Sequence, residues 1–251
     1  MTEALKSTIP SGGGYDIAYV KTPGVGPMVV FLPGFRSDMN GTKALFLEEV
    51  CRARGQGFVR FDYGGHGESG GVFAEGTISS WTRDALTIID RITDGPVILV
   101  GSSMGGWIGL LCAVKRPDRV VGFIGLAAAP DFTDWIAARL TAAQRNELSA
   151  KGFIEEPNDY APEPYVFTRA LIDDGAGNRI LDGDIDLSIP VRLIQGMKDA
   201  DVPWQTAWRI KKALKSADVG GLMVEDGDHR LSRPEDLTRI GVVLVDLLAA
   251  F

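Results

Sequence analysis

The sequence predicts an α/β domain in which a doubly wound, mostly parallel sheet carries an inserted helical lid. Two observations predict this fold. Short apolar or β-branched runs alternate with longer helical patterns over most of the chain, and one stretch, residues 131–190, breaks that alternation. A chain of 251 residues is long enough to bury a large core without disulfides. We therefore expect a core formed by residues 1–130 and 191–251, and a lid formed by residues 131–190.

The core elements follow from the spacing of apolar residues and from the residues at the helix ends. The expected strands are residues 16–21, 28–32, 58–62, 97–100, 120–126, 191–195 and 221–224. The expected helices are residues 42–54, 79–92, 104–115, 205–214 and 234–248. Pro234 suits the first turn of the last helix because no backbone N–H is needed there, and Ser232 is the expected N-cap.

The stretch between residues 131 and 190 contains no convincing strand. Helical fragments at 141–151 and 165–173 are separated by several prolines and a Gly-Ala-Gly turn. A segment this long without a strand is usually functional in a compact domain, which favours a lid over the substrate. Aromatic residues of the lid, together with Trp107, are candidates for an apolar acyl pocket, although packing explains each of them equally well. These residues are Phe132, Trp135, Tyr160, Tyr165 and Phe167.

Charge and composition exclude several classes of protein. The net charge is −7 and the basic residues form no long run, so nucleic acid is not an expected partner. Apolar stretches are too short to span a membrane, and the N-terminus lacks the pattern of a signal or transit peptide. Cys51 and Cys112 have no metal-binding or redox spacing and are expected to be buried thiols, with a single disulfide as the alternative. We expect a soluble, cytoplasmic protein of unknown oligomeric state.

The segment VILVGSSMGGW at residues 97–107 contains the motif G-x-S-x-G between an apolar strand and an apolar helix. In such a nucleophile elbow, a sharp turn exposes the serine hydroxyl and small neighbours let strand and helix approach closely. A second match at residues 67–71 contains Ser69, but it follows its strand at a distance and precedes no helix. Ser103 is therefore the expected nucleophile, and Ser69 is the alternative.

A serine hydroxyl becomes a good nucleophile only when a base removes its proton. The chain has two histidines. His66 lies upstream in a glycine-rich loop, where a packing or hydrogen-bonding role is expected. His229 follows the last strand and precedes the last helix, which is the position of the base when the order is serine, acid, histidine. His229 is therefore the expected general base.

The acid should follow an earlier strand and accept a hydrogen bond from the imidazole Nδ1–H. The segment GMKDADVPW follows the strand at residues 191–195 and offers Asp199 and Asp201. Asp199 is favoured and Asp201 is the alternative. Asp226 and Asp228 are interpreted as solvated neighbours, because a residue beside the base in sequence rarely faces its ring.

An acyl-transfer transition state needs two preorganised N–H donors for its oxyanion. The backbone N–H of Met104, directly after the nucleophile, is the first expected donor. The second is the backbone N–H of Phe35, where PGF bends sharply after a strand; a plain turn is the alternative. Arg36, next in sequence, is a candidate partner for a carboxylate on the substrate.

The motifs FLPGF, RFDYGGHGESGG, DGPVILVGSSMGGW, GMKDADVPW and DHR extend over nearly the whole chain. In this order they resemble serine hydrolases of the α/β-hydrolase superfamily. More narrowly, they resemble the acyl-protein thioesterase and acyl-glucuronide esterase family, which is palmitoyl-protein thioesterase-like and mitochondrial in animals. The resemblance implies a triad of Ser103, Asp199 and His229 that hydrolyses an acyl ester or thioester of a small molecule or of an acylated protein. Pro33 departs from the commoner His-Gly oxyanion loop, and residues 131–190 match less well than the core.

Two segments partly match motifs for dinucleotide or calcium binding. Residues 65–70 satisfy G-x-G-x-x-G after a strand, but no helix opens there to bind a dinucleotide phosphate. The segment DGDID at residues 182–186 lacks the later glycine and glutamate of a calcium loop, and two histidines build no zinc motif. Neither a cofactor nor a metal is expected. A non-catalytic small-molecule binding protein of the same fold is the rival of a different class, and haloperoxidase-like, lyase or aminopeptidase chemistry uses the same residues.

Overall fold

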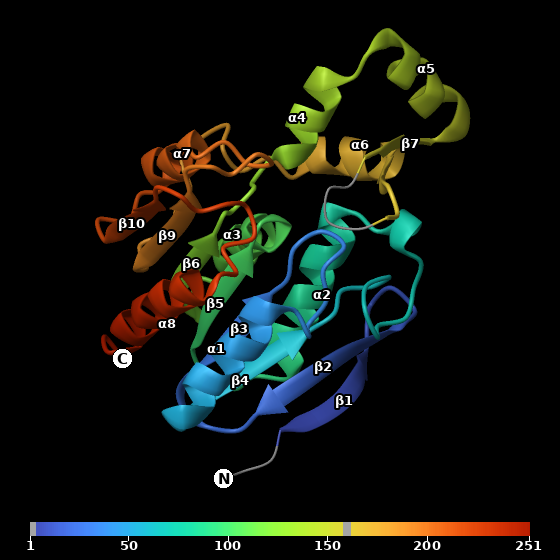
Figure 1. Cartoon of the computed structure of the whole chain (residues 1–251). Helices are drawn as coiled ribbons and strands as arrows, with labels where there is room; N and C mark the ends of the chain where they lie inside the picture. Colours follow the sequence, from blue (N-terminus) through green and yellow to red (C-terminus); the bar gives the residue numbers. More distant parts are fainter. Residues whose placement is uncertain (1–3, 158–161) are drawn as a thin grey trace.

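The computed structural model describes residues 4–157 and 162–251. Its centre is an eight-stranded sheet in the order β1-β2-β4-β3-β5-β6-β9-β10, in which β1, β2 and β4 pair in antiparallel fashion and the remaining pairs are parallel (Figure 1). The strands are β1 (Leu5–Pro10), β2 (Asp16–Thr22), β3 (Val25–Leu32), β4 (Gln56–Phe61), β5 (Val97–Ser102), β6 (Val120–Leu126), β9 (Val191–Gly196) and β10 (Val219–Val224). The predicted α/β fold with a mostly parallel sheet is confirmed.

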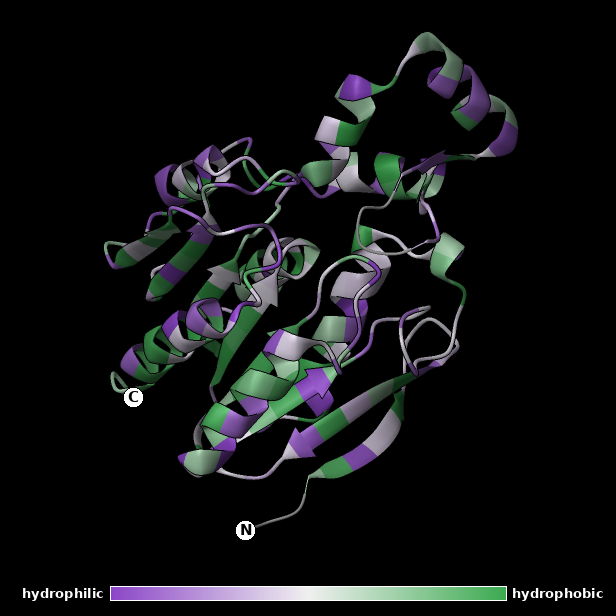
Figure 2. Cartoon of the chain, in the orientation of Figure 1, coloured by the Kyte–Doolittle hydropathy of each residue, from purple (hydrophilic) through white to green (hydrophobic). Residues whose placement is uncertain are grey.

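Helices cover both faces of the sheet. They are α1 (Thr42–Ala53), α2 (Ile78–Arg91), α3 (Met104–Lys115), α7 (Gln205–Ala213) and α8 (Pro234–Leu248), with a 3₁₀ turn η1 (Phe73–Glu75) before α2. Alternate residues of each strand face opposite layers: Val30 and Leu32 pack on the side of α2, α3 and α7, whereas Val29 and Phe31 pack on the side of α1 and α8. Figure 2 shows the central strands as mainly hydrophobic, as expected for strands buried on both faces.

The segment between β6 and β9 contains α4 (Phe132–Arg139), α5 (Ala142–Lys151), β7 (Phe153–Glu156), β8 (Tyr165–Thr168) and α6 (Arg169–Gly177). We call residues 131–190 the lid segment. The expectation that it holds no strand is wrong, because β7 and β8 form a two-stranded antiparallel sheet. The helix expected from residue 165 begins only at Arg169, since Thr168 caps it by accepting the N–H of Leu171. Tyr160 lies outside the described residues.

The lid segment is anchored at both of its stems. Asp131, in a left-handed conformation with φ 59°, accepts the backbone N–H of Ile180 and of Leu181, each at 2.9 Å. The indole Nε1 of Trp107, on α3, donates to the carbonyl of Asn178 at 3.1 Å. These bonds hold the beginning of the lid segment close to residues 178–181, which follow α6, and tie both to α3 (Figure 1).

Three smaller predictions can be compared with the structure. Ser232 is not the N-cap of α8: Arg233 holds that position, with Pro234 in the first turn as predicted, and the Ser232 hydroxyl donates to the carbonyl of Arg230. Cys51 and Cys112 are buried free thiols, as predicted. None of the helices in the described part of the chain is long and apolar enough to cross a membrane.

Candidate active site

Ser103 lies on the sharp turn between β5 and α3. Its backbone angles, φ 53° and ψ −120°, are strained for a residue with a side chain. The turn depends on two glycines. A Cβ on Gly105 would lie 2.1 Å from the carbonyl oxygen of Leu32, and one on Gly101 would lie 2.3 Å from the carbonyl oxygen of Gly105. Strand and helix therefore approach closely only with glycine at both positions, which is the arrangement of a nucleophile elbow.

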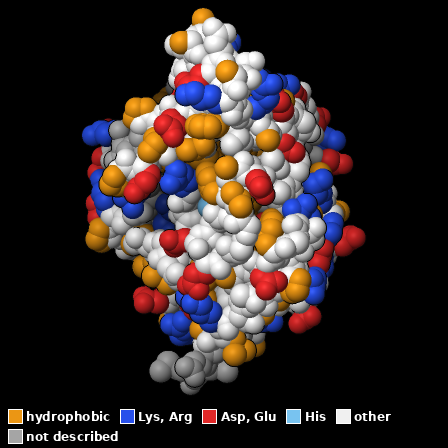
Figure 3. Space-filling model, turned by 90° about the vertical axis from the view of Figure 1, so that its right-hand side faces the viewer, with side chains coloured by type: hydrophobic (Ala, Val, Ile, Leu, Met, Phe, Trp, Pro, Cys, Tyr) orange, Lys and Arg blue, Asp and Glu red, His pale blue; other side chains and the backbone are white. Residues whose placement is uncertain are grey.

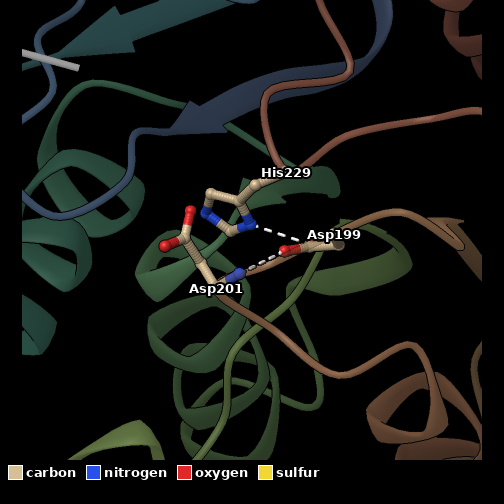
Figure 4. A group of neighbouring side chains, drawn as sticks. All are labelled: Asp199, Asp201 and His229. Atoms are coloured by element: carbon tan, nitrogen blue, oxygen red, sulfur yellow. Dashed lines mark hydrogen bonds and ion pairs between the residues drawn. The ribbon is translucent and has the colours of Figure 1, made fainter. Parts of the chain in front are cut away.

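The structure brings Ser103, His229 and Asp199 together from three separate strand ends. The Nε2 of His229 lies 3.1 Å from the Oγ of Ser103, and its Nδ1 lies 2.9 Å from the Oδ2 of Asp199. Figure 4 shows the imidazole of His229 directed at the carboxylate of Asp199. A proton on Nδ1 leaves Nε2 free to accept the hydroxyl proton of the serine, which is the tautomer that a general base requires.

The carboxylate of Asp199 accepts four hydrogen bonds. Oδ2 binds His229 and the side-chain amide of Gln195 at 2.8 Å, and Oδ1 accepts the backbone N–H groups of Asp201 and Val202 at 2.9 and 2.8 Å. Gln195 was not among the predicted site residues, although a polar residue in the otherwise apolar end of β9 is a signal for it. Asp199 is thus held in one orientation, with its side chain fully buried.

Asp201, the alternative acid, supports Asp199 through its backbone instead of binding the imidazole Nδ1. One ligand atom from each of Asp199, Asp201 and His229 lies within 4.8 Å of the others, a spacing that a metal ion also accepts (Figure 4). A cation bound there would replace the hydrogen bond between His229 and Asp199. In the structure, His229 Nδ1 and the backbone N–H of Asp201 instead both hydrogen-bond to the Asp199 carboxylate.

Hydrogen bonds within the loop that carries His229, and one from α1, fix the conformation of this loop. The Oδ1 of Asp228 accepts the N–H of Leu231 at 2.9 Å, while Lys43 on α1 donates to the carbonyl of Arg230. Burial lowers the pKa of Lys43 to about 8. Asp226 pairs with Arg233 at 2.6 Å. Neither Asp226 nor Asp228 hydrogen-bonds to the imidazole, in agreement with their interpretation as neighbours of the base.

The turn after β3 lies against Ser103. A Cβ on Gly34 would lie 3.4 Å from the Cβ of Ser103, and the N–H of Ser37 donates to the carbonyl of Gly34 at 3.1 Å. We call residues 34–37 the oxyanion turn. Among the described residues, the backbone N–H groups of Phe35 and Met104 have no protein acceptor. Phe35 and Met104 line the same cavity as Ser103, and two free N–H donors in such a place are what an oxyanion would need.

A cavity of about 640 Å³ opens onto Ser103 and His229 between the core and the lid segment. Figure 3 shows hydrophobic side chains around a hollow on this face, with Lys and Arg side chains on one side of it. Its apolar lining includes Phe35, Phe132, Trp135, Ile136, Tyr165 and Phe167. Trp107, a candidate for this lining, does not line the cavity; it is fully buried, which is the packing alternative. The guanidinium of Arg36 lines the cavity and donates to the carbonyl of Pro164 at 2.7 Å.

The loop between β4 and α2 contains the second G-x-S-x-G match. Its Ser69 hydroxyl accepts the N–H of Ala18 at 2.8 Å and donates to the carbonyl of Asp62 at 2.7 Å, which ties the loop to β2. No helix opens at residues 65–70, since α2 begins at Ile78. These hydrogen bonds therefore fix the loop to the sheet. Residues 65–70 do not lead into the helix N-terminus that a dinucleotide phosphate would need.

Known proteins resemble this chain in sequence and in fold. Residues 29–240 match the model of the Alpha/beta hydrolase family. The palmitoyl-protein thioesterase ABHD10, mitochondrial, of Homo sapiens is 38% identical over 93% of this chain and 76% of its own length. A crystal structure of a putative hydrolase from Agrobacterium vitis S4 superposes with a TM-score of 0.93, at 43% identity over 98% of both chains. The alpha/beta hydrolase domain-containing protein 10 from mouse gives a TM-score of 0.91, at 35% identity over 98% of this chain and 99% of its own.

The family match covers most of the chain, and these relatives share both sequence and fold over nearly its whole length. The expected resemblance and the expected hydrolase class are both confirmed. The chain belongs to the alpha/beta hydrolase family.

Proposed function

We propose that this protein is a serine hydrolase that cleaves thioesters or esters of acyl groups through an acyl-enzyme intermediate. The observation that carries the proposal is the hydrogen-bonded chain Ser103–His229–Asp199 at the floor of a partly apolar cavity. The thioesterase names of the relatives support an acyl substrate. His229 already contacts the Ser103 hydroxyl, so it can take the hydroxyl proton directly.

In the acylation step, the Oγ of Ser103 attacks the acyl carbonyl carbon while Nε2 of His229 takes the hydroxyl proton. Asp199 keeps the imidazole in the required tautomer and stabilises the imidazolium that forms. The carbonyl oxygen becomes an oxyanion, and the N–H groups of Phe35 and Met104 donate to it. Collapse of this intermediate expels the thiolate or alkoxide, which takes the proton from His229.

In the deacylation step, water enters the place of the leaving group. His229 removes a proton from this water as its oxygen attacks the acyl carbon, and the same two N–H groups hold the second oxyanion. When the Oγ of Ser103 leaves, it regains its proton from His229 and the free acid departs. Each proton that His229 takes is therefore returned within one turnover.

The lid segment supplies much of the apolar wall for the acyl group. Phe132, Trp135 and Ile136 on α4, with Tyr165 and Phe167 on β8, line the cavity. Apolar contacts with these side chains would stabilise acyl chains longer than a few carbons. The proposed substrate is accordingly an acyl thioester or ester, either of a small molecule or of an acylated protein.

Activity-based labelling tests the proposal. Wild-type protein and Ser103→Ala would be treated with a fluorophosphonate probe, digested and mapped by mass spectrometry, and a series of p-nitrophenyl esters and acyl thioesters would be assayed in parallel. We expect label on Ser103, none on the variant, and turnover that depends on acyl length. A folded wild-type protein with neither label nor turnover would contradict the proposal and favour a non-catalytic binding protein. Label on Ser69 instead would contradict the assignment of the nucleophile.

A further inference from the structure

We propose that His66 is a positioning residue that holds the oxyanion turn in its working conformation. This inference rests on the proposed function of that turn. His66 is only 4% exposed and lies in the loop between β4 and α2, remote in sequence from the elements that carry the proposed nucleophile, base and acid. Its Nε2 lies 3.2 Å from the backbone nitrogen of Arg36, which follows the expected oxyanion donor Phe35.

The hydrogen bonds of His66 define its protonation state. The N–H of Arg36 is a donor, so Nε2 of His66 must be the unprotonated acceptor. The single proton of the neutral ring then lies on Nδ1, which faces the carbonyl of Gly64 at 3.3 Å. The surroundings support this neutral form, because the ring packs edge-on against Tyr63, Phe73 and Trp81. Burial lowers the pKa of His66 to about 4.

The conformation of Arg36 explains why the turn needs this bond. Arg36 has φ 54°, a left-handed conformation that is unfavourable for a residue with a Cβ. A rotation of the peptide between Phe35 and Arg36 would relieve this strain. The same rotation would turn the N–H of Arg36 away from His66 and leave a buried acceptor without its donor. The bond to His66 thus favours the strained form of the turn.

The peptide groups on both sides of Phe35 are fixed as a result. The peptide before it belongs to Gly34, which lies against Ser103, and the peptide after it is fixed by His66. Asp62, in the same loop as His66, adds a second tie by accepting the N–H of Met39 at 2.7 Å. The N–H of Phe35 therefore keeps one direction relative to the serine without contacting His66 itself.

The test uses a pair of substitutions and a matched control. His66→Phe keeps an aromatic ring but removes the acceptor, whereas His66→Gln retains an acceptor oxygen on a side chain of similar reach. Tyr63→Phe is the control, because it alters the same loop but removes a buried hydroxyl that has no hydrogen-bond partner in the described part of the chain. All three variants would be assayed with one p-nitrophenyl ester at a temperature well below their unfolding transitions.

We expect His66→Phe to lower kcat by about 10- to 100-fold with KM changed less than about threefold, since one oxyanion donor is misaligned but the cavity is intact. Affinity for a trifluoromethyl ketone, which forms an oxyanion when it adds to the serine, should fall by the same factor as kcat/KM. His66→Gln should recover most of the loss, and Tyr63→Phe should equal the wild type. Unchanged kcat in His66→Phe, or an equal loss in His66→Gln, would overturn the proposal.

A second measurement needs no variant that might lose its fold. With two histidines in the chain, nitrogen-15 NMR of the labelled wild-type protein can report the tautomer of each ring. We expect His66 to be neutral and protonated on Nδ1 from pH 6 to 8. A proton on Nε2 would overturn the proposed bond. Failure of the proposed function would show separately, as absence of wild-type turnover with the Nδ1–H tautomer present.

Discussion

The core and the lid segment hold their functional side chains in different ways. In the core, Ser103 and Asp199 follow strands of a sheet buried on both faces, and each is fixed by several hydrogen bonds or by glycines that admit no alternative. The lid segment consists of short helices and a small hairpin, and it reaches the site through aromatic side chains. From this difference we propose that the core determines the chemistry and that the lid segment determines which acyl group is accepted.

The largest expected effect is at Ser103, the proposed nucleophile of the core. Ser103→Ala should lower kcat by about 10⁴- to 10⁶-fold, because the variant has no hydroxyl to attack the acyl carbon. The fold should be retained, because the alanine methyl group occupies the same place as the serine Cβ. Ser69→Ala is the matched control: it should keep kcat but lower Tm by a few degrees, since Ser69 makes two hydrogen bonds between β2 and its loop. Steady-state kinetics and thermal unfolding measure both effects. The opposite pattern would show that the wrong serine has been assigned.

The two carboxylates after β9 provide the next test. Asp199→Asn should lower kcat by up to about 10⁴-fold, because an amide that donates to Nδ1 stabilises the wrong imidazole tautomer. Asp201→Asn should lose less than about tenfold, since Asp201 supports Asp199 through its backbone N–H. Rates for both variants would be measured with the same ester. A larger loss in Asp201→Asn would make Asp201 the acid.

The pH dependence of the free energy of unfolding tests whether His66 is buried in its neutral form. Burial and the charge of Arg36 together lower the pKa of His66 to about 4, against the opposing effects of the hydrogen bond to Gly64 and the charge of Asp38. The unfolded chain therefore binds a proton first, at its ordinary pKa near 6.5. Neutral His66 therefore contributes fully to the free energy of unfolding above about pH 6.5. As the pH falls towards 4, the free energy of unfolding decreases progressively, by about 3 kcal/mol in all.

Urea unfolding at pH 7 and pH 4.5 measures this loss, with His66→Gln as the reference that cannot titrate. We expect the wild type to lose more unfolding free energy than the variant over this interval. Equal losses would mean that His66 is protonated without cost, in conflict with its buried surroundings.

The smallest expected effect concerns the lid segment. Trp135→Ala should raise KM for esters of ten or more carbons by about tenfold and leave KM for butyryl esters within about twofold, because Trp135 lines the cavity and a longer acyl chain buries more apolar surface against such a wall. Trp208→Ala is the control, since Trp208 is 53% exposed on α7 and does not line the cavity. A uniform change across all chain lengths in Trp135→Ala would contradict the division between core and lid segment.

The same division explains what the sequence predicts. Ser103, Asp199 and His229 each follow a strand with a strong apolar pattern, so the order of strand, turn and helix places them at one edge of the sheet. The strands of the lid segment escape prediction because each of β7 and β8 has only four residues. Strand β1 also escapes prediction, because its residues are mostly exposed and lack an apolar face.

Two site features could not be read from the sequence. The sequence leaves both a cavity position and a packing position open for Trp107, because α3 is apolar on almost every side and its pattern does not indicate which face meets the cavity. The contact between His66 and Arg36 joins residues from separate loops, and its partner is a backbone N–H, which any residue except proline carries. Such a contact leaves no pattern in the sequence.

The most direct test of the account is to detect the acyl-enzyme itself. Wild-type protein would be mixed with p-nitrophenyl butyrate, quenched in acid within milliseconds, and measured by intact and peptide mass spectrometry. The account predicts a transient butyryl adduct on the peptide that contains Ser103, formed with the first release of nitrophenol and absent in Ser103→Ala. Turnover accompanied by an adduct on another residue would contradict it.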